Sequence, residues 1–244
     1  MLIAKNIHKS FGDKVVLDGV DVTIKPGEIT CAIGPSGTGK TTLLRALALL
    51  DYPSEGNISV DGQVFDFPLS AEQEEQGIDA PWPKLTAVFQ SLFLWPHLTL
   101  RENIMLPARN HNKKAEEDIE GLIQLFEMDH FIDNFPNEAS IGQRQRVALA
   151  RALILNPKYI LMDEITSALD VEQTGRILKK LEHLKERGIG MFLITHAIGF
   201  AERASDQILF MDGGKIAEVG GPEIIKSPKS KRLGDFLSLA SEVM

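Results

Sequence analysis

Residues 34–41 read GPSGTGKT, a glycine-rich run that ends in Lys-Thr. Its residues Gly34, Pro35, Ser36, Gly37, Thr38, Gly39, Lys40 and Thr41 match the pattern G-x-x-x-x-G-K-[ST]. The apolar run 29–33 precedes them and a helix is expected at 41–50, which is the strand–loop–helix setting that the pattern requires. Glycines let successive backbone N–H groups point at phosphate oxygens, and the positive end of the following helix adds to that field. Lys40 can reach the β- and γ-phosphates of a nucleotide, and the Thr41 hydroxyl can bind Mg²⁺.

A second motif ends an apolar strand with two acids. Residues 159–164 read YILMDE. Adjacent side chains on a strand point in opposite directions, so Asp163 can hold Mg²⁺ through water while Glu164 faces an attacking water. The pair is a weak signal alone, because strands often end in Asp or Glu. Together with the phosphate loop it predicts a site for nucleotide hydrolysis.

The rest of the chain alternates strand and helix patterns. Strands are expected at 15–17 and 20–24, separated at Asp18-Gly19, and a hairpin is expected at 57–60 and 63–65. A surface loop is expected at 66–84 and a helical region at about 98–156. Further strands are expected at 86–89, 159–162 and 191–195, a helix ending at Gly188 between the last two, and a hairpin at 208–211 and 215–219. This order predicts an α/β P-loop NTPase core with a mostly parallel sheet, antiparallel strands on one side and a helical insertion.

Composition narrows the class of partner. The 244 residues carry a net charge of −8, which argues against loose binding to nucleic acid or anionic lipid but leaves specific docking to a membrane protein open. The single cysteine, Cys31, excludes an internal disulfide and is expected to be a buried core residue. The apolar run 46–50 is far shorter than the ~20 residues that span a bilayer, and residues 1–12 do not resemble a signal peptide.

Four further segments follow the phosphate loop along the chain. The first is VFQ, which ends at Gln90 and precedes FLWPHLT at 93–99. The others are ASIGQ at 139–143, SALD at 167–170, and Thr195-His196 after a strand. With these segments the chain resembles the ATP-binding subunits of ABC transporters nearly from end to end. The resemblance implies one ATP-binding domain over 1–244, with a helical subdomain at about 92–156, and it implies ATP and Mg²⁺ as cofactors.

The resemblance also implies roles for individual residues. Glu164, His196 and Gln90 are the expected catalytic residues, with His196 at the γ-phosphate. Thr41, Gln90 and Asp163 are the expected metal site. Nucleotide contacts are expected from the phosphate loop and from a further set, with Phe11 stacking on adenine: Phe11, Val16, Thr42, Ser140, Gly142, Gln143 and Asp170.

Residues 139–143 depart from the family's usual Leu-Ser-Gly-Gly-Gln. Ser140 and Gln143 fit the S-x-x-Q capping box of a helix start. The resemblance adds that Ser140, Gly142 and Gln143 complete the ATP site of a second copy. Ile141 replaces a glycine and would be strained if its φ had to be positive. The other replacements are Ala139 for Leu and Ile165 for the usual Pro after the catalytic Glu.

The implied partners are a second ATP-binding subunit, in the simplest case an identical one, and transmembrane permease subunits, with an extracytoplasmic solute-binding protein acting indirectly. The expected location is the cytoplasmic face of the cell membrane, as a peripheral subunit, and nucleic acid is not an expected partner. Residues 200–206 and 210–216, FAERASD and FMDGGKI, resemble polar amino acid importers. The short sequence after the last hairpin leads us to expect no extra regulatory domain.

Other functions stay open. Import of another small solute and export of lipid or lipoprotein are alternatives. A soluble ATPase of this type acting on ribosomes or DNA is a further class, although such relatives usually carry two domains or a long coiled coil. A weakly hydrolysing member of a heterodimer is the last alternative, suggested by Ile141.

Overall fold

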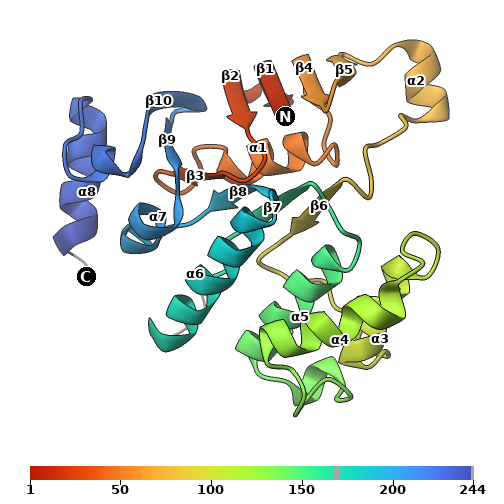
Figure 1. Cartoon of the computed structure of the whole chain (residues 1–244). Coiled ribbons are helices and arrows are strands. Elements are labelled where there is room, and N and C mark those ends of the chain that lie inside the picture. Colours follow the sequence, from red (N-terminus) through yellow and green to blue (C-terminus); the bar gives the residue numbers. More distant parts are fainter. Residues whose placement is uncertain (167–170, 243–244) are drawn as a thin grey trace.

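Two sheets form the framework of the protein (Figure 1). The computed structural model describes residues 1–166 and 171–242. The larger sheet has the order β10-β9-β3-β8-β7-β6 and the smaller one the order β2-β1-β4-β5. The strands of the larger sheet are β3 (Ile29–Ile33), β6 (Leu85–Val88), β7 (Tyr159–Asp163), β8 (Gly190–Ile194), β9 (Gln207–Asp212) and β10 (Lys215–Gly220). The predicted α/β fold is thereby confirmed.

Five neighbouring strands of the larger sheet, β9, β3, β8, β7 and β6, run parallel. All residues of β3, β7 and β8 are buried, including Cys31, as the continuous apolar runs predicted. Only β10 pairs antiparallel with its neighbour, β9. Since these five strands run in one direction, the segments that follow them emerge at one edge of the sheet.

The smaller sheet is antiparallel and covers one face of the larger one. It consists of β1 (Leu2–Phe11), β2 (Lys14–Ile24), β4 (Glu55–Val60) and β5 (Gln63–Phe67). The predicted break at Asp18-Gly19 is wrong, because β2 runs through it with shifts of register against β1. The inner faces of these strands share one hydrophobic core with helix α1 (Lys40–Leu47).

Asp61, in the turn between β4 and β5, ties the two sheets together. Its carboxylate accepts hydrogen bonds from the Tyr159 hydroxyl at 2.7 Å and from Lys158 Nζ at 2.8 Å. The bonds from Lys158 and Tyr159 hold the pKa of the Asp61 carboxyl well below its usual range.

Asp61→Asn should lower the free energy of unfolding by about 1–3 kcal/mol at pH 7, because it removes a charged acceptor for Tyr159 and Lys158. The folded pKa lies below the unfolded value of about 3.9, so this stabilisation is present above that pH and is lost as the pH falls toward the folded pKa. Urea denaturation at pH 7 and pH 3 should therefore show a smaller difference at pH 3. Asp66→Asn, on an exposed position of β5, is the matched control, and an equal loss in both variants would contradict the assignment.

Three α-helices lie between β6 and β7 and form the separate lower part of the molecule in Figure 1. They are α3 (Leu100–Ala108), α4 (Ala115–Phe126) and α5 (Ile141–Leu153), with the 3₁₀ turn η1 (Pro136–Glu138) before α5. Their apolar faces join the same hydrophobic core as β3, β7 and α6 (Val171–Glu186). The remaining helical elements are α7 (Ile198–Ala204), η2 (Pro222–Ile225) and α8 (Lys231–Glu242).

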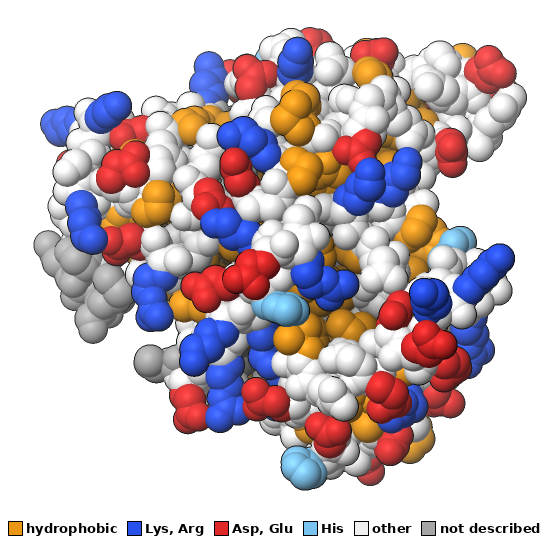
Figure 2. Space-filling model, viewed as in Figure 1, with side chains coloured by type: hydrophobic (Ala, Val, Ile, Leu, Met, Phe, Trp, Pro, Cys, Tyr) orange, Lys and Arg blue, Asp and Glu red, His pale blue; other side chains and the backbone are white. Residues whose placement is uncertain are grey.

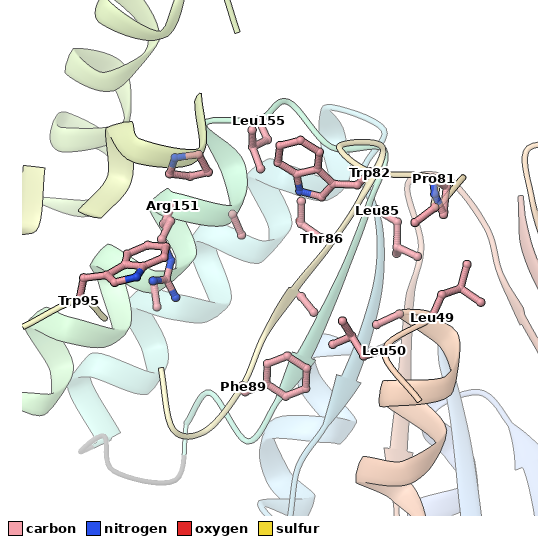
Figure 3. Close-up of a pocket in the computed structure, with 16 residues that line it drawn as sticks. Leu49, Leu50, Pro81, Trp82, Leu85, Thr86, Phe89, Trp95, Arg151 and Leu155 are labelled. Carbon is pink, nitrogen blue, oxygen red and sulfur yellow. The ribbon is translucent and has the colours of Figure 1, made fainter. Parts of the chain in front are cut away.

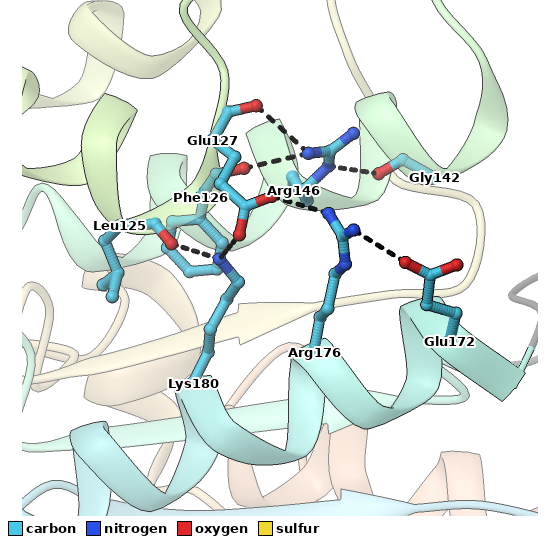
Figure 4. Close-up of polar contacts among 8 residues, drawn as sticks. All are labelled: Leu125, Phe126, Glu127, Gly142, Arg146, Glu172, Arg176 and Lys180. Carbon is cyan, nitrogen blue, oxygen red and sulfur yellow. Dashed lines mark hydrogen bonds and ion pairs between the residues drawn. The ribbon is translucent and has the colours of Figure 1, made fainter.

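A charged cluster fastens this helical part to α6 (Figure 4). Arg176 of α6 pairs with Glu127, which follows α4, at 2.7 Å. Lys180 of α6 pairs with the same carboxylate at 3.6 Å and also donates a hydrogen bond to the Leu125 carbonyl. The charged cluster and the shared hydrophobic core together hold the helical part against α6 and the larger sheet.

The segment 66–84 is not the continuous surface loop that its composition predicted. It contains helix α2 (Ala71–Gln76), which begins with a capping box between Ser70 and Gln73. No residue of α2 is buried, so the sequence lacks the apolar stripe by which a helix is usually predicted. Among the described helices, none has the length and hydropathy needed to cross a membrane.

Candidate active site

A cavity of about 350 Å³ lies where the segments after β3, β7 and β8 come together. Four separate parts of the sequence line it: strand β2, the phosphate loop with the start of α1, the segment after β7 and the segment after β8. The lining residues are Lys14, Val16, Ser36, Gly37, Gly39, Lys40, Thr41, Thr42, Glu164 and His196.

The phosphate loop has a backbone that requires glycine at two of its positions. Gly34 has φ 145°, and a Cβ there would lie 2.2 Å from the Met211 carbonyl oxygen. Gly39 has φ 97°, and a Cβ there would lie 2.7 Å from the Val16 carbonyl oxygen. Both glycines therefore let the loop pass close to neighbouring backbone before α1 begins at Lys40.

Lys40 is held inside this loop. Its side chain is buried and donates hydrogen bonds to the Gly34 and Pro35 carbonyls, both at 2.8 Å, while the Thr38 hydroxyl donates to Pro35 at 2.9 Å. Burial lowers the pKa of the Lys40 ammonium, and the nearby Glu164 and Asp163 act in the opposite direction. The ammonium is thus positioned where phosphate oxygens can take over the role of the loop carbonyls.

Asp163 and Thr41 form the part of the site that fits a magnesium ion. Asp163 is buried at the end of β7, and the Thr41 side chain lies close enough to affect the pKa of its carboxyl. Burial raises the pKa of the Asp163 carboxyl, and its Oδ1 atom is buried without a hydrogen-bond partner. Hydroxyl and carboxylate oxygens suit Mg²⁺, which usually takes one or two protein ligands and fills its other positions with phosphate and water. Among the described residues, no group of three or more Asp, Glu, His or Cys side chains is arranged to hold a metal ion.

Glu164 and His196 contact each other in the wall of the cavity. The His196 Nε2 atom lies 3.0 Å from the Glu164 Oε1 atom. Glu164 has φ 51°, a left-handed conformation uncommon for this residue type, and its backbone N–H donates to the Ile194 carbonyl at 2.9 Å. This bond to the last residue of β8 fixes the turn that brings the carboxylate beside the imidazole.

Other predicted site residues lie outside this cavity. Phe11 is exposed at the end of β1, and Gln90 is exposed in the turn after β6, at the same edge of the sheet as Asp163. Asp170, with the rest of 167–170, lies outside the described residues. Sequence reasoning missed Lys14, which lines the cavity and pairs with Phe11 across the β1–β2 hairpin. Only the register of that hairpin reveals its position.

Ser140, Gly142 and Gln143 begin helix α5, away from the cavity of their own chain. The predicted capping box is confirmed: Ser140 Oγ accepts from the Gln143 N–H at 3.2 Å, and Gln143 Oε1 accepts from the Ser140 N–H at 2.7 Å. The possibility of a strained Ile141 is not borne out, because Ile141 is the first residue of α5 and does not have a positive φ. Its side chain is 49% exposed.

A second, mainly apolar groove of about 430 Å³ lies along β6 (Figure 3). The core lines one flank and the helical part lines the other. Representative residues are Leu50, Trp82 and Phe89 from the first flank and Trp95, Arg151 and Leu155 from the second. Trp82 and Trp95 are 44% and 38% exposed, so a partner protein could contact large apolar side chains in this groove.

A phosphate loop opening a helix, with an acidic pair at the end of a parallel strand two places away in the sheet, defines a P-loop nucleotide hydrolase. The family model of ABC transporters matches residues 17–167, more than half of the chain. The glutamine transport ATP-binding protein GlnQ of Escherichia coli (strain K12) is 42% identical, with 99% of this chain and 100% of that protein covered. The arginine transport ATP-binding protein ArtM of Bacillus subtilis (strain 168) is 41% identical, covering 97% and 98%.

Solved structures point the same way. The ATP-binding cassette MJ0796, in a dimeric post-hydrolysis state bound to ADP and Pi, is similar to this chain with a TM-score of 0.79 and 31% identity, covering 91% of this chain and 99% of that one. The chain belongs to the ABC transporter family, and within it to the ATP-binding subunits that hydrolyse ATP.

Proposed function

We propose that this chain powers a membrane importer of a polar amino acid. The observation that carries the proposal is identity of 42% and 41%, over nearly the whole chain, to proteins named for glutamine and arginine transport. L-cystine import is named for a further relative at 40% identity. No single amino acid is common to these names, so the proposed substrate is the class.

The hydrolytic step is proposed to use residues of the cavity in distinct roles. Lys40 and the backbone N–H groups of residues 36–42 bind the phosphates and stabilise negative charge on the transferred group. Glu164 accepts a proton from the attacking water, and His196, 3.0 Å from it, orients that carboxylate and reaches the γ-phosphate. Thr41, Asp163 and Gln90 would hold Mg²⁺. The metal neutralises phosphate charge when bound.

Adenine is proposed to lie against the β1–β2 hairpin. Phe11 offers an exposed ring there, and Val16 and Lys14 line the adjoining side of the cavity. Base stacking on an exposed aromatic ring needs no particular hydrogen bond, so it would bind adenine with little specificity for that base.

A second copy is proposed to complete each ATP site. Ser140, Gly142 and Gln143 stand at the N-terminus of α5, whose positive end favours a phosphate, yet they lie outside the cavity of their own chain. An antiparallel arrangement of two copies would bring this helix start to the partner's γ-phosphate. Asp170 is proposed to lie near the same interface, as the family resemblance implies.

Ile141 tests this arrangement, because its exposed side chain stands on the helix start that would face the partner's ATP. Ile141→Gly should raise ATPase activity by up to about tenfold, equivalent to about 1.4 kcal/mol, through easier closure. Ile141→Ala should raise it similarly, because the backbone is already helical and only side-chain bulk is removed. Steady-state ATPase and ATP-dependent dimerisation measure both variants. Higher ATPase activity in Ile141→Gly alone would indicate that φ of residue 141 changes on closure. Unchanged activity in both variants would show that Ile141 does not lie at the interface.

The permease subunits are proposed to dock in the groove beside Gln90. The groove is mainly apolar and partly exposed, and it lies between the core and the helical part. A permease segment bound there would contact both parts, so movement of the helical part relative to the core would be transmitted to the permease. On the face shown in Figure 2, acidic and basic side chains are intermixed, as suits a protein partner better than nucleic acid. Docking of this kind would place the subunit peripherally at the cytoplasmic face of the membrane.

Uptake measurements test the proposed substrate class. Cells carrying Glu164→Gln as the only copy should lose uptake of at least one labelled polar amino acid, with wild-type cells as the reference. Normal uptake of all polar amino acids together with a defect in another transport would favour a different small-solute importer or an exporter. Turnover that appears only when a different ATP-binding subunit is added would favour the heterodimer.

A further inference from the structure

Arg151 connects helix α5 to the segment that follows Gln90. Its Nη1 atom donates a hydrogen bond to the Phe93 carbonyl at 2.7 Å, and its Nη2 atom donates to the Leu92 carbonyl at 2.5 Å. The guanidinium carbon lies 5.1 Å from the centre of the Trp95 ring, and Figure 3 shows the two side chains next to each other. One side chain thus contacts three residues of this segment.

The two carbonyls belong to residues in an unusual conformation. Leu92 has φ 56° and Phe93 has φ 46°, a left-handed region that bulky side chains rarely adopt. The turn is closed locally by the Leu92 N–H, which donates to the Phe89 carbonyl at 2.9 Å. Gln90 lies within this turn. A left-handed pair persists only where surrounding contacts hold it, and the guanidinium supplies two such contacts.

Helix α5 places Arg151 on the same rigid element as Ser140 and Gln143. Ser140 caps the helix, and Arg151 lies in its last turn. A shift of the helix start toward ATP would therefore move the guanidinium and, through it, the carbonyls that shape the Gln90 turn. Arg151 is half-buried, and this burial lowers the pKa of its guanidinium.

We propose that Arg151 is a positioning residue for Gln90. Its guanidinium sets the conformation of the Gln90 turn according to the position of α5, the helix that Ser140 caps. The inference rests on the proposed function, since hydrolysis is the reaction that Gln90 serves. The planar fork of arginine fits two adjacent carbonyls and stacks on an indole, whereas a lysine ammonium acts as a single point of charge. Lysine is therefore an inadequate replacement.

The test compares Arg151→Ala and Arg151→Lys with Arg146→Ala. Arg146 is a matched control on the same helix: it donates to the Phe126 and Glu127 carbonyls at 3.0 and 3.1 Å and lies 4.9 Å from the Phe131 ring, away from the Gln90 turn. We expect Arg151→Ala to lower kcat for MgATP about tenfold with KM changed less than about twofold, because the phosphate loop is untouched. Arg151→Lys should stay impaired.

Two further measurements distinguish positioning from stability. Hydrogen exchange in the peptide that spans residues 89–95 should accelerate about tenfold in Arg151→Ala and remain unchanged in Arg146→Ala. Turnover of the double variant with Gln90→Ala should equal that of Gln90→Ala alone, because both changes act on one group.

The inference is overturned if Arg151→Ala loses no more turnover than Arg146→Ala, if lysine restores it, or if the two losses multiply in the double variant. Absence of ATPase activity in the wild-type protein would instead overturn the proposed function. The exchange experiment needs no turnover, so it still decides whether Arg151 holds the Gln90 turn.

Discussion

Glu164→Gln should bind MgATP as tightly as the wild-type chain and lose turnover by about 10²- to 10⁴-fold, the usual contribution of a general base. The carboxylate lines the cavity beside His196, at 3.0 Å, and is separate from Lys40, which is held by the carbonyls of the phosphate loop. Glutamine keeps the size of the side chain but cannot accept the proton. Because closure without hydrolysis traps the nucleotide, an ATP-bound dimer should accumulate.

Single-turnover hydrolysis, calorimetric ATP affinity and size-exclusion chromatography measure these three results. Glu202→Gln is the matched control: Glu202 pairs with Lys226 at 2.6 Å, away from the cavity, and this variant should keep full turnover. Retained turnover in Glu164→Gln would place the base elsewhere. Loss of ATP affinity in the same variant would mean that Glu164 contributes to binding.

The parts of this fold that the sequence predicted are those encoded locally. Strand β3 occupies 29–33 as expected, because a continuous apolar run followed by glycine leaves little choice. The capping box of Ser140 is likewise confirmed, since its hydrogen bonds join residues three apart. The phosphate loop lies between β3 and α1, as its pattern required.

The parts that sequence reasoning missed depend on distant contacts. Gly19 lies inside β2 because pairing with β1 carries the strand through a position that favours turns. Lys14 reaches the cavity through the register of that hairpin, and Arg151 reaches the Gln90 turn across 58 residues of sequence. The predicted strain at Ile141 depended on a positive φ, and the first position of α5 does not require one. The roles of Gln90 and Asp170 remain predictions from resemblance.

Lys40→Ala should abolish detectable MgATP binding, a loss of about 100-fold or more in affinity, with turnover lost in parallel. A charged hydrogen bond contributes about 1.5–3 kcal/mol, and Lys40 supplies several donors from within the loop. Removing the ammonium also leaves Asp163 and Glu164 facing an ATP of like charge, which adds repulsion. The close approaches of Gly34 and Gly39 to neighbouring backbone remain in this variant, so we expect the loop to keep its shape.

Calorimetry with MgATP and thermal unfolding of the same sample separate loss of the site from loss of the fold. Lys215→Ala is the matched control, because Lys215 pairs with Asp18 at 3.0 Å and does not line the cavity. Its affinity for MgATP should equal that of the wild-type chain. Wild-type affinity in Lys40→Ala would reject the phosphate loop as the binding site, since the ammonium held by Gly34 and Pro35 would then have no part in holding the nucleotide. Weakened binding with a midpoint of unfolding lowered by several degrees only in Lys40→Ala would instead assign Lys40 a structural role, as a brace for the two loop carbonyls to which it donates.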